Sequence, residues 1–345
     1  IEKNCQVQYD TVSKRWYLSN SSPVAHEHIE VVETQPVDSD HESVRDFIHK
    51  STGLKPRGLI MSDLKWKYLV RSAMRGKNIM MQGPAGSGKT LAAKYLVTAL
   101  QRPDFYFNLG ATQDPRATLI GNTHFNKDTG TYFSESLFVK AIQTENAVIL
   151  LDELSRAHPE AWNILMTVLD LNQRYLRLDE KDGAPTIKVA DGVSFIATAN
   201  IGNEFTATRK LDRALEDRFI TIEMDTLSRD LEFDLLRMKF PLVAENTLAA
   251  IAEISSGTRA EVKSSNPKLS NSISTRVAEE VASLIYDGFS LADAAEVAIY
   301  PFFSEDGGVD SERTYVKQIV QKFCIDEQAV VADPFNANDA VATPA

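Results

Sequence analysis

MQGPAGSGKT, residues 81–90, carries the strongest structural signal in this chain. Within it, residues 83–90 match GxxxxGK[ST] completely; they directly follow the apolar run IMMQ and lead into a helical pattern at residues 89–100. The glycines let the backbone wrap around phosphates, to which the following helix offers its N-terminal amides. We expect Lys89 to reach the β- and γ-phosphates of a nucleotide and Thr90 to ligate Mg²⁺. The alternative is an ordinary glycine-rich turn between a strand and a helix.

Two carboxylates, Asp152 and Glu153, end another apolar run, AVILLDE. If this run is a buried strand, they stand at its C-terminal end, where open α/β sheets bind ligands. We expect Asp152 to hold Mg²⁺ through its water shell and Glu153 to act as a general base toward the attacking water. The presence of such a base favours an ATP-hydrolysing enzyme over a small-molecule kinase. A GTPase is disfavoured because the guanine-selecting NKxD pattern is absent from the sequence. Taken alone, such a pair usually marks a strand leaving the core.

Polar side chains near the ends of two later segments are further candidates for the nucleotide site. Asn200 closes the run VSFIATAN, where it either helps to hold the attacking water or caps the next turn. The segment TATRKLDRALEDRF, residues 206–219, predicts a helix, and Arg218 directly precedes the next strand pattern. A guanidinium there is expected to project toward a neighbouring subunit and to stabilise charge on its γ-phosphate. Arg213 is the alternative for that role, although arginines on helices are usually solvated.

The order of the apolar segments predicts an α/β fold followed by an all-helical region. Up to Asp225, buried-strand patterns alternate with helical patterns, which is typical of a parallel sheet with helices on both faces. The predicted strands are IMMQ, FYFNL, AVILLDE, VSFIATAN and ITIEMD. After Asp225, apolar residues recur at helical spacing, which predicts a helical bundle. The predicted helices cover residues 228–240, 244–256, 273–288, 291–303 and 313–323.

We therefore predict four regions along the chain. They are an N-terminal β-hairpin and acidic linker at 1–55, a nucleotide-binding α/β core at 56–227, a helical lid domain at 228–328 and a disordered tail at 329–345. The hairpin is predicted from QVQYDTVSKRWYLSN, with Val7, Tyr9, Trp16 and Leu18 as candidate buried residues. The linker is predicted from the Ser-, Pro-, Asp- and Glu-rich segment at residues 19–44.

Composition narrows the class of protein. With 345 residues and 43% hydrophobic content, the chain is long enough for two domains. No apolar run approaches the roughly 18 residues of a membrane-spanning helix, and the first residues lack the pattern of a leader, so we expect a cytoplasmic protein. Cys5 and Cys324 are the only cysteines and predict no disulfide framework. The net charge of -11 disfavours broad nucleic-acid binding and favours protein substrates.

The motifs GPAGSGKT, VILLDE, ATAN and LDRALEDRF, in this order and spacing, resemble the MoxR branch of the AAA+ ATPases. The chain is most similar to the CbbQ-, NorQ- and CobS-like members of the helix-2-insert clade, and the resemblance runs from about Leu59 to Phe323. It implies a P-loop AAA+ core with a C-terminal helical lid. It also implies ATP and Mg²⁺ as cofactors and a homo-oligomeric ring, usually a hexamer, with ATP bound between subunits. Residues 1–55 depart from the family pattern, and the resemblance assigns them no role.

The same resemblance implies roles for the residues of the two Walker motifs. Asp152 and Glu153 correspond to Walker B, and Thr90 and Asp152 are the residues expected to hold the metal. Walker A and the residue that follows it comprise Gly83, Pro84, Ala85, Gly86, Ser87, Gly88, Lys89, Thr90 and Leu91.

Other roles are implied farther along the chain. Asn200 corresponds to sensor 1, Arg218 to the arginine finger and Arg276 to sensor 2. Leu59 and Ile60 fall where the family packs the adenine, although both fit a hydrophobic core at least as well.

Two insertions fit this branch. Residues 122–141 alternate around the turn KDTG, and residues 174–192 form a second hairpin pattern before Asn200. In the family, these hairpins face the pore of the ring, where ATP-driven movement acts on a substrate. The alternative is a pair of ordinary surface hairpins.

The function expected from the sequence is an ATP-hydrolysing ring that remodels or activates a protein partner. The resemblance implies a protein client or a von Willebrand A-type adaptor as that partner, and it includes metal or cofactor insertion among the tasks of such a motor. The alternatives are the motor subunit of a CobS-like metal chelatase and a nucleic-acid-associated motor. A non-hydrolysing scaffold is disfavoured because Lys89, Asp152, Glu153, Asn200 and Arg218 are all present.

Overall fold

The computed structural model describes residues 5–10, 15–20, 36–127, 130–200 and 211–324. These residues fall into two compact units. The first ends at Met224 and the second begins at Asp225, with the short segment Ala85–Ser87 grouped with the second. Within the described residues, every helix is too short or too polar to cross a membrane.

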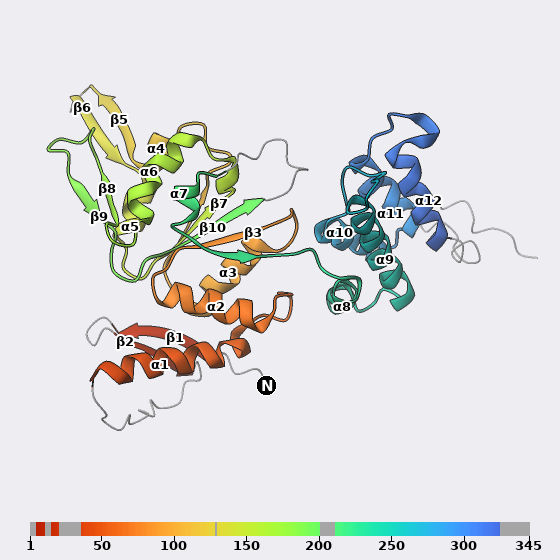
Figure 1. Ribbon diagram of the computed structural model, residues 1–345, viewed down its shortest axis with the longest axis horizontal. Coiled ribbons are helices and arrows are strands. Elements are labelled where there is room, and N and C mark those ends of the chain that lie inside the picture. Colours follow the sequence, from red (N-terminus) through yellow and green to blue (C-terminus); the bar gives the residue numbers. More distant parts are fainter. Residues whose placement is uncertain (1–4, 11–14, 21–35, 128–129, 201–210, 325–345) are drawn as a thin grey trace, which may run out of the picture. The chain divides into compact units, whose positions relative to one another are not determined.

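A five-stranded parallel sheet forms the centre of the first unit, with the strand order β11-β3-β10-β7-β4 (Figure 1). All five predicted strands are confirmed. Their bounds are β3 Ile79–Gly83, β4 Asp104–Asn108, β7 Val148–Asp152, β10 Ser194–Asn200 and β11 Ile220–Glu223. The sheet is parallel because helical segments return the chain between its strands. The predicted α/β fold is thereby confirmed.

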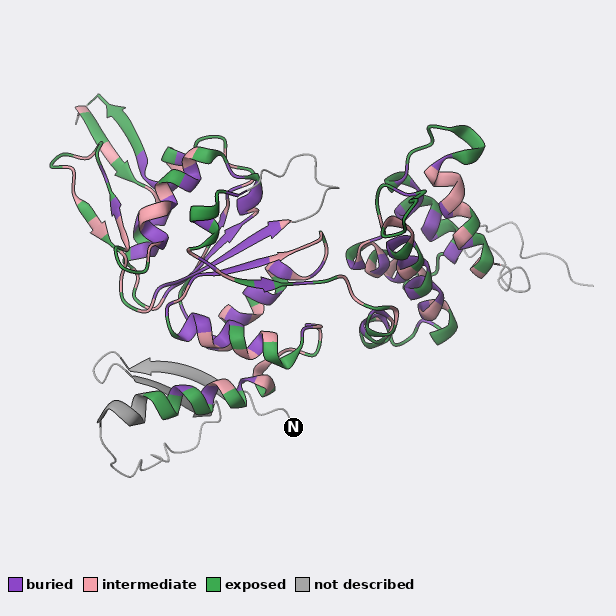
Figure 2. Ribbon diagram, viewed as in Figure 1, coloured by how far each residue is buried: buried purple, intermediate pink, exposed green. Residues whose placement is uncertain are grey.

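Helices cover both faces of this sheet, and its central strands are almost entirely buried (Figure 2). Successive side chains enter different cores: Ile149 and Leu151 of β7 join one cluster, and Val148 and Leu150 join the other. The first cluster includes residues of α4 Pro115–Leu119, α5 Leu137–Gln143, α6 Pro159–Leu169 and α7 Arg213–Glu216. The second includes residues of α1 Pro36–Lys50, α2 Asp63–Met74 and α3 Lys89–Leu100.

Both expected insertions form antiparallel hairpins. The first joins β5 Gly121–Asn126 to β6 Gly130–Glu135, and the second joins β8 Tyr175–Arg177 to β9 Thr186–Lys188. Lys181, in the connection of the second hairpin, lies 2.5 Å from the Glu135 carboxylate at the end of the first. An ion pair therefore links the two hairpins.

The N-terminal hairpin is also confirmed, as β1 Cys5–Asp10 paired with β2 Arg15–Asn20. The side chains that we expected to be buried in it lie outside the described part. Residues 19–44 were predicted to be a linker, and this is wrong for the part that the structure describes. The first two residues belong to β2, which extends to Asn20, and the last nine belong to α1, which begins at Pro36. Val44 and Phe47 lie one helical turn apart on α1 and are buried in the same cluster as α2. Their apolar spacing was obscured by the polar residues around them.

The second unit is a helical bundle in its described part, as predicted. Its helices are α8 Arg229–Lys239, α9 Glu245–Val262, α10 Thr275–Tyr286, α11 Leu291–Ala298 and α12 Glu312–Cys324, around one apolar core. Short 3-10 helices in the chain are η1 Ser51–Leu54, η2 Leu154–Arg156, η3 Tyr300–Phe302 and η4 Gly308–Asp310. The predicted tail lies outside the described residues.

A buried ion pair holds this bundle together. The Arg259 guanidinium donates to both oxygens of Glu232, at 2.7 and 3.0 Å, and also to the carbonyls of Ile273 and Leu227. The side chains of Arg259 and Glu232 are only 6% and 0% exposed, so each charge is compensated by its partner and not by solvent. The pair therefore joins α8 and α9 to the segment that leads into α10.

Replacing Arg259 with Leu is expected to destabilise the protein by about 3–5 kcal/mol, because the Glu232 carboxylate is left buried without its partner. Urea unfolding of the full chain, followed by circular dichroism, measures this loss. Arg237→Leu is the matched control, since Arg237 on α8 pairs with Asp234 at an exposed position and should cost far less. Equal losses for the two variants would contradict this role of the buried pair.

Candidate functional site

The loop between β3 and α3 has the backbone of an anion cradle. Gly86 and Gly88 have φ values of 74° and 82°, a conformation that side chains rarely adopt. A Cβ at Gly83 would collide with the carbonyl oxygen of Met224, so only glycine fits where β3 ends. Gly88 caps α3 without any side-chain hydrogen bond, and the space beside it is open. An anion at this helix terminus would accept hydrogen bonds from the first amides of α3.

Lys89 is buried at the start of α3, with 7% of its surface exposed. Its Nζ donates to the carbonyl oxygens of Gly83 and Pro84 at 2.9 and 2.7 Å. Burial lowers the pKa of Lys89 to about 8, and this effect is opposed by the nearby Asp152 and Glu153 carboxylates. A buried ammonium group in a loop of backbone donors suits a phosphate group.

Asp152 lies at the C-terminal end of β7 and is 8% exposed. Its Oδ1 accepts hydrogen bonds from the hydroxyls of Thr90, at 3.0 Å, and of Thr198. Its Oδ2 accepts one from the Tyr106 hydroxyl at 2.8 Å. The structure thus brings together Thr90 and Asp152, the two residues expected to hold Mg²⁺. Hydroxyl and carboxylate oxygens are ligands of the type that Mg²⁺ prefers.

Thr198 and Tyr106 were not among the predicted site residues. Both lie on strands next to β7, with side chains on the α3 side of the sheet, as the register and the alternation of side chains require. Partial burial of the Tyr106 hydroxyl and its hydrogen bond to Asp152 raise the pKa of Tyr106 to about 12, so this hydroxyl stays protonated and donates. The signal for Thr198 was a polar residue near the carboxyl end of a predicted strand, whereas Tyr106 lies in the middle of its strand and had no such signal.

Glu153 directly follows β7 and adopts a left-handed conformation, with φ 56° and ψ 38°. Its amide donates to the Thr198 hydroxyl at 3.0 Å, and its carboxylate lies 3.5 Å from the Arg156 guanidinium. A Cβ at Gly110 would clash with the Glu153 carboxylate and lie 2.7 Å from its Cβ. Gly110 was also missed, and its lack of a side chain leaves room for Glu153.

Asn200 ends β10 and pairs in register with Gly83, so it stands beside the start of the glycine-rich loop. Its amide donates to the Ser155 hydroxyl at 3.2 Å. The structure therefore places Asn200 at the same edge of the sheet as Asp152, which is the edge reached by the carboxyl ends of all five parallel strands.

The helix predicted at residues 206–219 is shorter than expected. Residues 201–210 lie outside the described part, and α7 covers only Arg213–Glu216. Arg218 lies in the turn after α7, not on a helix, and donates to the carbonyl oxygens of Met166, at 2.9 Å, and Ala214, at 2.6 Å. It also lies 3.4 Å from Asp170. By contrast, Arg213 is exposed and makes no ion pair with the described residues.

The remaining predicted site residues differ in how far they are exposed to solvent. Leu59 is 4% exposed and belongs to the apolar cluster on the α3 side, which agrees with its alternative interpretation as a core residue. Ile60 is half-buried, and Leu91 on α3 is 39% exposed. Arg276 is the second residue of α10 in the helical unit and is exposed.

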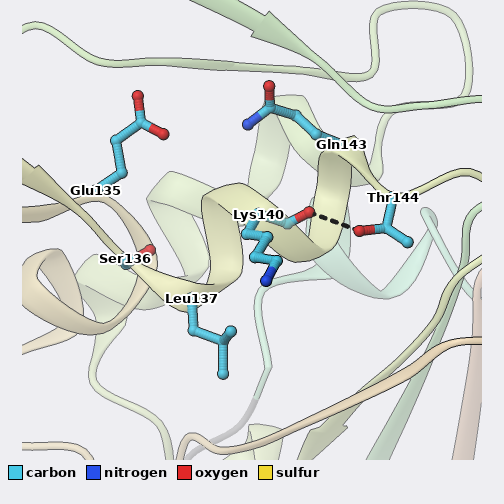
Figure 3. A pocket seen from close by; sticks show the side chains of 6 residues that line it. All are labelled: Glu135, Ser136, Leu137, Lys140, Gln143 and Thr144. Carbon is cyan, nitrogen blue, oxygen red and sulfur yellow. Dashed lines mark hydrogen bonds between the residues drawn. The ribbon is translucent and has the colours of Figure 1, made fainter.

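A surface pocket along α5 shares no residue with this site. Its lining runs from Glu135 and Leu137 to Lys140 and Thr144 (Figure 3). The polar groups that line it are largely engaged by the protein: Glu135 pairs with Lys181, and the Thr144 hydroxyl donates to the carbonyl oxygen of Lys140 at 2.9 Å. No chemical role follows from this pocket.

Residues 78–219 match the model of the AAA domain, dynein-related subfamily. The "Putative chaperone BssE" of Thauera aromatica is 34% identical over 223 residues, which cover 64% of this chain and 74% of that protein. An uncharacterized protein of Staphylococcus saprophyticus is 27% identical over 211 residues, or 60% of this chain and 74% of its own length. The crystal structure of a "putative ATPase" from Cytophaga hutchinsonii has a TM-score of 0.44 and 18% identity, covering 83% of this chain and 98% of that one.

Proposed function

Because this chain belongs to the AAA+ ATPases, with an AAA domain of the dynein-related subfamily, we propose that it is a motor of the MoxR type that remodels or activates a protein partner. It is an ATPase. The observation that carries the proposal is the arrangement of Asp152 and Glu153 beside the glycine-rich loop. Asp152 is the last residue of β7 and Glu153 directly follows it, and Thr198 contacts both.

We assign the following roles within one chain. The segment Gly83–Leu91 binds the phosphates, with Lys89 meeting their negative charge, and Thr90 and Asp152 hold Mg²⁺. Bound Mg²⁺ neutralises charge on the phosphates. Glu153 accepts the proton of the attacking water, and Asn200 helps to hold that water. Leu59 and Ile60 are assigned to the adenine side of the site.

We further propose that the chain works as a homo-oligomeric ring, of hexameric type, in which each nucleotide site is completed by a neighbour. Arg218 is assigned as the arginine that acts on the neighbouring site, and Arg276 as a second nucleotide-sensing arginine. The resemblance of LDRALEDRF to the family motif supports the first assignment. The contacts of Arg218 within its own chain make it a group that must be released before it can act in a neighbouring site.

A protein is the proposed substrate, either directly or through a von Willebrand A-type adaptor. The name "Putative chaperone BssE" of the Thauera relative and the net charge of -11 support a protein over a nucleic acid. No feature of the described residues favours the chelatase or the nucleic-acid motor over this proposal.

Trapping the ATP-bound state tests the proposed function. The Glu153→Gln variant, loaded with ATP in cell extract, is expected to retain protein partners that are released when ADP replaces ATP, because hydrolysis can no longer drive release. Lys89→Ala is the control, since it should not bind ATP. If the same proteins are recovered with Lys89→Ala, or if only nucleic acid is recovered with Glu153→Gln, the proposed protein-remodelling role is wrong.

A further inference from the structure

Tyr106 stands on the edge strand of the sheet but reaches the centre of the site. It lies on β4, which pairs with β7 on one side only, and its side chain is 47% exposed. In register, Tyr106 is opposite Leu150, so its side chain shares a sheet face with Asp152, two residues farther along β7. The diagonal distance between such positions is within reach of an aromatic side chain.

The Tyr106 hydroxyl is the described donor to Asp152 Oδ2, at 2.8 Å. The other carboxylate oxygen, Oδ1, accepts from Thr90 and Thr198. Hydroxyls from β4, α3 and β10 therefore hold both oxygens of Asp152. Without the Tyr106 hydroxyl, Oδ2 loses its described protein donor, and the carboxylate is fixed at one oxygen only.

We propose that Tyr106 is a positioning residue for Asp152: its hydroxyl fixes Oδ2 and so sets the orientation in which the carboxylate meets hydrated Mg²⁺. This inference rests on the proposed function, because it presumes that Asp152 serves Mg²⁺ at a nucleotide site. Tyr106 contributes no bond to the phosphates in this role. Its loss should therefore affect the metal dependence of nucleotide binding and leave metal-free binding unchanged.

Tyr106→Phe is the appropriate substitution. It removes the hydroxyl and keeps the aromatic ring, over which Lys94 Nζ lies 5.8 Å from the centroid. Binding of a fluorescent ADP is measured with the full chain in EDTA and across a titration of Mg²⁺. We expect the affinity in EDTA to match the parent, and the Mg²⁺ concentration at half-effect to rise about tenfold, the scale set by one hydrogen bond to a charged group. Tyr68→Phe is the matched control, because the Tyr68 hydroxyl on α2 has no hydrogen bond with the described residues.

A double-mutant cycle separates positioning from a general structural effect. In an Asp152→Asn background, Tyr106→Phe should cause no further change in Mg²⁺ dependence, because the group that it positions is altered. Unchanged Mg²⁺ dependence in Tyr106→Phe, or the same shift with and without Asp152, would overturn the inference while leaving the proposed function intact. If the parent protein itself binds nucleotide with no Mg²⁺ dependence, the proposed metal site fails first.

Discussion

Replacing Glu153 with Gln is expected to slow ATP hydrolysis by about 10²–10⁴-fold, the contribution typical of a general base. ATP binding should be unchanged, because the Glu153 carboxylate is assigned to the water and not to the phosphates. The left-handed backbone of Glu153 and the missing side chain of Gly110 give this carboxylate a fixed place that Gln can also occupy. Steady-state phosphate release and binding of a fluorescent ATP analogue measure the two effects separately.

Lys89→Ala provides the opposite pattern, since loss of the ammonium group that meets the phosphates should abolish nucleotide binding itself. Glu145→Gln is the matched control for charge, because Glu145 is exposed and lies outside the site. Hydrolysis at the parent rate by Glu153→Gln would show that the general base is a different group.

Replacing Arg218 with Ala is expected to lower the rate of ATP hydrolysis by about 10³-fold or more without loss of ATP binding, as is typical of an arginine finger. A purely structural role predicts another result. Arg218 holds the carbonyl oxygens of Met166 and Ala214, so its loss would then lower stability and activity together. Thermal unfolding distinguishes the two. Arg213→Ala is the informative comparison, because Arg213 is exposed and is the alternative finger.

Much of the fold could be predicted because its signals are local in sequence. The five strands are short apolar runs, and the helical unit repeats apolar residues at helical spacing. The glycine-rich loop and the carboxylates Asp152 and Glu153 were found for the same reason, since each motif is contiguous. Helix α1 was missed because only a few buried residues, among them Val44 and Phe47, interrupt an otherwise polar segment.

What the sequence could not supply were contacts between distant segments. Tyr106 and Thr198 meet at Asp152 only because β4 and β10 flank β7 in a defined register. Gly110 matters because it approaches Glu153 in space. Nothing in the sequence indicated that Arg218 contacts Met166, because the two residues are 52 positions apart in the chain.

We propose that ATP is hydrolysed at sites completed by a neighbouring subunit. Mixing Arg218→Ala subunits, in which Lys89 is intact, with Lys89→Ala subunits, in which Arg218 is intact, tests it most directly. ATP turnover is followed across mixing ratios, and co-assembly is verified by native mass spectrometry. We predict that two variants inactive on their own recover partial hydrolysis when mixed, because some interfaces then combine an intact loop with an intact arginine. Verified co-assembly with no recovered hydrolysis would contradict the account.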